Sequence, residues 1–340
     1  LQAKISSRNG LPISEVTILI NGEAAQVLKP TAAQSQEFNV DMLLDITTGH
    51  NDIELVATNS AGTSSFKGTY ITANFDTQDG LPPQTLEKPR NLNVLAIGVS
   101  DYQRSRQDFT DLPLAASDAR VFAQAARDQA NGKLYAETHV KLLTDAEATR
   151  SACSDGLQWL VDTTESGDSV AIFIAAHGFV DSSQNFYVGT HDVELERPRA
   201  TAVPWSELIR TLHEDLPQCR RMVFLDLQPT EQAVAPSMRN PLLDLASPNL
   251  GTIFFSTNSL QQTQLPTPTG PRGFLTDALL ATLGDPTADV DPTPPDALLN
   301  ATELSSAWTN SVKALTDNRT YPVSYSPDSS RQLNLLQLKP

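Results

Sequence analysis

Two short apolar segments, each ending in polar residues, constrain the fold of this chain more than any other feature. Segment 168–178 (DSVAIFIAAHG) ends in a His-Gly pair, and segment 221–230 (RMVFLDLQPT) carries Asp226 and Gln228 near its end. Short runs rich in β-branched and aromatic residues are typical of strands buried on both faces. In open α/β sheets, chemistry lies just past the carboxyl ends of such strands. We therefore expect His177 and Gln228, 51 positions apart, to lie at one rim of a sheet.

The rest of the chain from residue 91 alternates between strand and helix patterns. Further strands are predicted at 93–99, 138–144, 252–256 and 332–338, and helices at 112–130, 145–164, 203–213 and from 302 onward. Pro204 is expected in the first turn of its helix. Strands that alternate with helices predict a mostly parallel sheet covered by helices on both faces.

Several motifs in this region resemble, in order, those of the caspase-like cysteine peptidases, the group that includes metacaspases and their bacterial relatives. They are the Ile-Gly-Val-x-x-Tyr segment ending at Tyr102, the Leu-x-x-Ala-x-x-Asp-Ala helix start containing Asp118, His177-Gly178, the hairpin 186–192 and the helix start at 270–280. The resemblance covers residues 91–338. It implies a caspase-like α/β fold for residues 91–340.

The chain departs from the family pattern at the position of the catalytic nucleophile and in the residues that follow it. In the family, the second strand ends in Asp-x-Cys-x-Ser-Gly, the Cys is the nucleophile, and its His lies about 50 residues upstream. Here Asp226 and the spacing are kept, but Gln228 stands at the nucleophile position and Pro229-Thr230-Glu231 follow it. An amide offers no thiolate, and losing the nucleophile of such a site costs on the order of a million-fold in turnover. The resemblance therefore implies a retained base, His177, without a nucleophile.

Neither cysteine is expected to replace the missing one. Cys153 falls in a predicted helix, and Cys219 precedes the strand that ends at Gln228, so it belongs at the opposite end of the sheet. Both are expected to be small buried hydrophobic residues. Two cysteines are too few for a disulfide framework or a thiolate zinc site, which favours a reduced, cytoplasmic setting. We expect no cofactor and no metal, because the acidic loop 285–291 lacks the central Gly of a calcium loop.

Three further residues are candidates for a substrate pocket. In metacaspase-like members, acids that match Asp118 and Asp226 form a pocket for Arg or Lys, and Ser256 matches a residue at the rim of the cleft. A basic-residue pocket could thus persist without cleavage. In the alternative interpretation, Asp118 caps or pairs locally and Asp226 binds backbone at the end of its strand. The sequence leaves both interpretations open.

Residues 1–75 have a different character. Short alternating strands separated by Asn- and Gly-rich turns at Asn21-Gly22 and 59–62 predict an all-β unit. The pattern resembles bacterial Ig-like or fibronectin-like modules, which implies a β-sandwich. Residues 76–90 contain Gly80-Leu-Pro-Pro83 and are predicted to be a linker.

Charge and hydropathy limit the partners. The net charge is −16 with a pI near 4.6, which argues against nucleic acid and anionic membranes. No apolar run is long enough to span a bilayer.

The resemblance and the loss of the nucleophile imply a catalytically inactive, caspase-like protein that binds a protein or peptide partner, which could be basic. Two alternatives stay open: an active peptidase cleaving after Arg or Lys through a displaced nucleophile, and a structural carrier domain. The sequence does not indicate an oligomeric state.

Overall fold

A computed structural model provides the structure of the protein. It describes residues 2–7, 10–20, 23–31, 36–41, 49–72, 90–103, 109–130, 133–216, 219–230, 242–246, 251–257, 272–290, 296–319, 322–327, 330–331 and 333–339. The chain divides into two compact units, Leu1–Leu86 and Glu87–Pro340. Most of the predicted linker and the Asn21-Gly22 turn lie outside the described residues.

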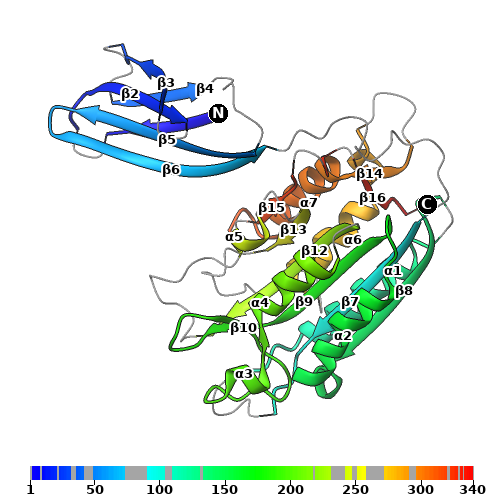
Figure 1. The fold of residues 1–340 in the computed structure, drawn as a ribbon. Coiled ribbons are helices and arrows are strands. Elements are labelled where there is room, and N and C mark those ends of the chain that lie inside the picture. Colours follow the sequence, from blue (N-terminus) through cyan, green and yellow to red (C-terminus); the bar gives the residue numbers. More distant parts are fainter. Residues whose placement is uncertain are drawn as a thin grey trace. The chain divides into compact units, whose positions relative to one another are not determined.

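The first unit is built from antiparallel strands (Figure 1). Strand β1 (Gln2–Ser6) pairs with β4 (Glu37–Asp41), and a second sheet has the order β3 (Glu23–Leu28), β2 (Ile13–Ile20), β5 (Gly49–Asn59), β6 (Gly62–Thr72). One apolar core takes residues from both sheets: Ile13, Val16, Ile18, Phe38, Val40, Ile53 and Leu55. The alternation of apolar and polar residues in the sequence therefore correctly predicts a strand-rich N-terminal region.

The second unit contains a mixed sheet that is mostly parallel. Its parallel strands have the order β8 (Tyr135–Thr144), β7 (Arg90–Gly98), β9 (Ser169–Val180), β12 (Arg220–Pro229), β13 (Thr252–Ser256). Strand β15 (Val323–Tyr325) adds an antiparallel edge beside β13. Strand β9 extends past the end of β7, where it pairs with the antiparallel strand β10 (Phe186–Val188), and β10 pairs in turn with β11 (Val203–Pro204).

Helices cover both faces of this sheet (Figure 1). On one face lie α1 (Ala115–Arg127), α6 (Phe274–Leu283) and α7 (Ala301–Leu315). On the other lie α2 (Arg150–Thr163) and α4 (Trp205–Arg210), which continues into a π-helical turn, Thr211–Asp215. The remaining elements are short: α3 (Pro198–Thr201), α5 (Leu242–Leu245), the 3₁₀ turns Asp145–Glu147 and Pro286–Ala288, and the strand pair β14 (Leu298–Asn300) and β16 (Asn334–Gln337).

Several element boundaries differ from the sequence prediction, and for two helices a cap explains where the helix begins. The helix predicted from residue 145 begins at Arg150, because Thr149 caps it by accepting from Ala152 N at 3.2 Å. Pro204 lies in β11 instead of a first helical turn. The last helix begins at Ala301, after a capping box formed by Asn300 and Glu303. None of the described helices is long and apolar enough to span a bilayer.

Candidate functional site

His177 and Gln228 lie side by side at the carboxyl ends of two neighbouring parallel strands. Strands β9 and β12 pair in continuous register from Ser169 and Arg220, and that register sets Gln228 opposite His177. Both strands are buried along their length, because their apolar side chains supply the cores on the two faces of the sheet. The sheet therefore fixes the positions of both residues.

The imidazole of His177 is held between two backbone carbonyls. Its Nε2 lies 2.8 Å from Thr110 O, and its Nδ1 lies 3.2 Å from Gln228 O. A neutral imidazole carries one N–H, so the shorter contact identifies Nε2–H as the donor to Thr110 and leaves the Nδ1 lone pair facing the Gln228 carbonyl. Burial lowers the pKa of His177 below its usual value, and the two carbonyls oppose that shift. Neither ring nitrogen faces a proton that it could abstract.

Aromatic residues close the remaining sides of the imidazole. Ring centroids of Tyr102 and Phe109 lie 5.2 and 5.4 Å from that of His177, and these two rings stack on each other at 5.3 Å. The Tyr102 hydroxyl also accepts from the backbone N–H of His177 at 2.8 Å. The side chain of His177 is consequently only 4% exposed.

Gln228 is directed toward Asp226 on its own strand. Residues two apart on a strand share a face, and Gln228 Nε2 donates to Asp226 Oδ1 at 3.3 Å. Thr257 Oγ1 donates to the same oxygen at 3.3 Å. Gln228 is 5% exposed and Asp226 is 3% exposed. The Gln228 side chain therefore serves as a buried hydrogen-bond donor.

Asp118 and Asp226 converge on one backbone position, Gly273, which precedes α6. Gly273 N donates to both carboxylate oxygens of Asp118, at 3.1 and 2.9 Å. A Cβ added at Gly273 would lie 2.5 Å from Asp118 Oδ2 and 3.0 Å from Asp226 Oδ2. Only glycine leaves room for this approach. The two acids share a site, and the chain itself fills the space between them.

Burial raises the pKa of Asp118 to about 7, with a further contribution from the charge of Asp226; the Gly273 N–H opposes the shift. Arg272 also lies nearby, where it forms an ion pair with Asp277. The charge of Arg272 lowers the pKa of Asp118, and the charge of Asp277 raises it. The acidic pair is thus buried and partly compensated from within the chain.

Ser256 is the last residue of β13, at the carboxyl end of that strand. It is fully buried, and its register partners are Leu225 on β12 and Val323 on β15. The next residue, Thr257, is the one that bonds to Asp226. Sequence reasoning placed Ser256 at the rim of a cleft and did not identify Thr257.

The two cysteines differ in where they lie. Cys153 is in the first turn of α2, beside Gly189 and Thr190; it is buried, and burial raises the pKa of its thiol to about 12. Cys219 precedes the first residue of β12, so nine residue steps, about 30 Å at 3.3 Å per residue, separate it from Gln228. Burial also raises the pKa of the Cys219 thiol. Burial of both thiols, and for Cys219 the length of β12, argue against either as a thiolate beside His177.

Other residues of the site escaped sequence reasoning. Phe109, Thr110 and Gly273 belong to this group, and Thr110 acts through its carbonyl, which any residue type provides. Only Gly273 had a usable signal, since it falls in the helix start at 270–280. Among the described residues no group of His, Cys, Asp and Glu side chains is arranged to hold a metal ion.

Comparisons with known proteins give a fold likeness only. No family model and no curated protein matches the chain. The structure is similar to protein GSU0716 from Geobacter sulfurreducens, with a TM-score of 0.52 and 14% identity, covering 74% of this chain and 100% of that one. A weaker overlap involves fibronectin(III)-like modules of Clostridium thermocellum CbhA, with a TM-score of 0.16 and 18% identity, covering 22% of this chain and 82% of that one. Another involves a carbohydrate esterase family 2 enzyme of Corynascus thermopiles, with a TM-score of 0.26 and 13% identity, covering 93% of this chain and 90% of that one. At these identities only the α/β fold shared with GSU0716 is informative.

Proposed function

We propose that this protein is a non-catalytic, caspase-like protein in which an Ig-like β-sandwich precedes the α/β unit, and that it acts by binding protein. The observation that supports this proposal best is the pairing of Gln228 with His177. Gln228 holds the position of the nucleophile, and its carbonyl faces one ring nitrogen of the base. The mostly parallel sheet and the order of the motifs are consistent with the caspase-like assignment.

Peptide hydrolysis by a cysteine needs a thiolate, a base and oxyanion donors. Gln228 supplies no thiolate. His177 has a carbonyl at each ring nitrogen, so it is poorly placed to accept a proton from a substrate group. Pro229 offers no N–H to an oxyanion. Gln228 therefore supplies no nucleophile, Pro229 supplies no oxyanion donor, and His177 is poorly placed as a base.

Binding makes weaker demands on the site than catalysis. The paired carboxylates of Asp118 and Asp226 would suit the fork of donors on an Arg side chain, once Gly273 moved aside. Whether they serve a basic partner or only anchor α6 is the same alternative that the sequence left open.

Turnover tests the non-catalytic assignment. We expect no cleavage of fluorogenic peptides ending in Arg or Lys, for the natural protein and for a Cys153→Ser, Cys219→Ser variant. Cleavage that survives loss of both cysteines but disappears in His177→Ala would instead establish an active peptidase with a displaced nucleophile. Gel filtration and circular dichroism of each variant would verify that it is folded.

A further inference from the structure

A groove with a volume of about 710 Å³ opens on the α2 and α4 face of the second unit. Strand β10 and the turn before it form one wall, α4 with its π-helical turn forms another, and Asp244 of α5 lies at one end. None of the groove residues belongs to the His177 and Gln228 site. The π-helical turn is notable because such turns frequently occur at functional sites.

An aromatic corner forms the apolar part of the groove. The rings of Phe186 and Trp205 meet edge to face, with centroids 5.6 Å apart and planes at 87°. The Phe186 ring packs directly against Gly178, where an added Cβ would lie 2.6 Å from the ring. The indole Nε1 of Trp205 is buried and has no acceptor among the described residues. This corner provides an apolar surface to the groove.

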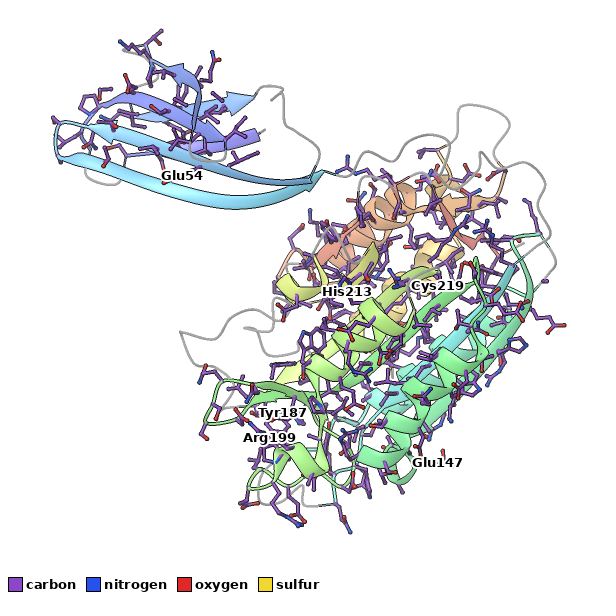
Figure 2. The ribbon with its side chains drawn as sticks, in the orientation of Figure 1. Glu54, Glu147, Tyr187, Arg199, His213 and Cys219 are labelled. Carbon is purple, nitrogen blue, oxygen red and sulfur yellow. The ribbon has the colours of Figure 1, made fainter. Side chains whose placement is uncertain are left out.

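A positioned cation lies beside this corner. Asp181 accepts from the backbone N–H groups of Ser183 and Asn185 at 2.8 and 2.9 Å, and from the Tyr187 hydroxyl at 3.0 Å. Arg199 lies near the Tyr187 hydroxyl, and it lowers the pKa of Tyr187 against the effect of burial. Figure 2 labels Tyr187 and Arg199 close to each other and His213 farther away. Arg199 lines the same groove as Phe186 and Trp205.

Arg199 differs from neighbouring arginines in its lack of a carboxylate partner. Arg197 pairs with Glu194, and Arg210 pairs with Asp215 at 2.8 Å. Within the described part of the chain no carboxylate forms an ion pair with Arg199, which is exposed. An exposed, oriented guanidinium is suited to bidentate recognition of a carboxylate.

The length of the groove indicates the size of its occupant. The wall from Trp205 to Glu214 has ten residues, about 15 Å at 1.5 Å per residue. An extended chain covers that distance in about five residues. A single small carboxylate would leave most of the groove empty, whereas a short peptide would fill it.

We propose that this groove binds a short peptide segment of a partner protein in which an aromatic side chain lies next to a carboxylate. The aromatic ring packs against Phe186 and the exposed edge of Trp205, and the carboxylate pairs with Arg199. The inference names the partner chemistry of the proposed binding role and rests on that role. Its site is distinct from the acidic pair of Asp118 and Asp226, which would suit a basic residue.

Binding of defined peptides tests the inference without any need for turnover. The ¹⁵N-labelled full chain is titrated with millimolar acetyl-Ser-Asp-Phe-Ser-amide, while the indole N–H signals are followed by NMR. We expect a saturable shift of the Trp205 signal, which is assigned by its loss in Trp205→Phe. Peptides with Lys in place of Asp, or Ala in place of Phe, should bind at least about fivefold more weakly, since each lacks one anchor.

Arginine variants locate the carboxylate contact. Arg199→Gln should weaken the Asp-Phe peptide about fivefold and leave the Lys-Phe peptide unchanged, because it removes only the carboxylate partner. Arg197→Gln is the matched control, since Arg197 is paired with Glu194, and it should bind as the natural chain does. The proposal is overturned by an unmoved Trp205 signal, by equal binding of all peptides, or by 3-phenylpropionate binding as tightly as the peptide. Because no activity is measured, these outcomes leave the non-catalytic assignment standing.

Discussion

The Nδ1 atom of His177 lies 3.2 Å from the carbonyl oxygen of Gln228, its register partner across strands β9 and β12. Because β9 and β12 are parallel and in register, both residues lie at the same end of the sheet. The contact is nevertheless made by the backbone of Gln228, while its amide points to Asp226. The contact between these residues is therefore a backbone contact, and the Gln228 side chain takes no part in it.

Gly273→Ala should destabilise the second unit by about 1–3 kcal/mol, the usual cost of overpacking. The added methyl group would collide with Asp118 Oδ2 and Asp226 Oδ2 and disturb the anchor of α6. Gly284→Ala is the matched control, because its Cβ would meet only the carbonyl oxygens of Leu280 and Ala281, at 3.4 and 3.7 Å. Urea unfolding of both variants measures the difference. Equal stability of the two would show that the acids are not packed against Gly273.

Asp118→Asn should flatten the dependence of stability on pH between about 4 and 7. The pKa of Asp118 is raised to about 7 in the folded chain, against about 3.9 in an unfolded one. Over this window the folded chain holds the proton more tightly, so the free energy of unfolding decreases as pH rises. The effect is a few kcal/mol at most. Unfolding free energies at several pH values test this, and parallel curves for both proteins would contradict it.

His177 should be neutral at pH 6.5, with its proton on Nε2. Burial lowers its pKa, so the unfolded chain gains a proton before the folded chain does, and this group reduces stability as pH falls through about 6.5. Imidazole ¹⁵N shifts in a long-range NMR correlation spectrum report both tautomer and charge, with the signal assigned by its loss in His177→Gln. A doubly protonated ring at pH 7 would mean that the two carbonyls outweigh burial.

Much of the framework could be predicted from the sequence because it depends on patterns that local physics imposes. Buried β-branched runs predicted strands β9 and β12, and parallel pairing then placed His177 beside Gln228. Asp118 was expected at the same rim because it begins the helix that follows the first parallel strand, and the structure brings it and Asp226 together at Gly273. These predictions needed only strand direction and the alternation of side chains.

The chemical state of the site could not be predicted because it depends on tertiary contacts that leave no pattern. The Thr110 carbonyl that binds His177 comes from a loop residue 67 positions upstream, and any residue could provide it. The collision that requires Gly273 involves carboxylates from two distant elements. The groove beside Arg199 depends on a hairpin, β10 and β11, that the sequence indicated only in part.

Covalent labelling tests the central claim, the absence of a catalytic nucleophile, most directly. The folded full-length protein is incubated with a peptidyl chloromethyl ketone that ends in Arg, and its intact mass is measured. We predict no adduct, because Gln228 cannot be alkylated as a thiolate and burial raises the pKa of the Cys153 and Cys219 thiols. An adduct that forms on the folded chain and is abolished by His177→Ala would contradict the account.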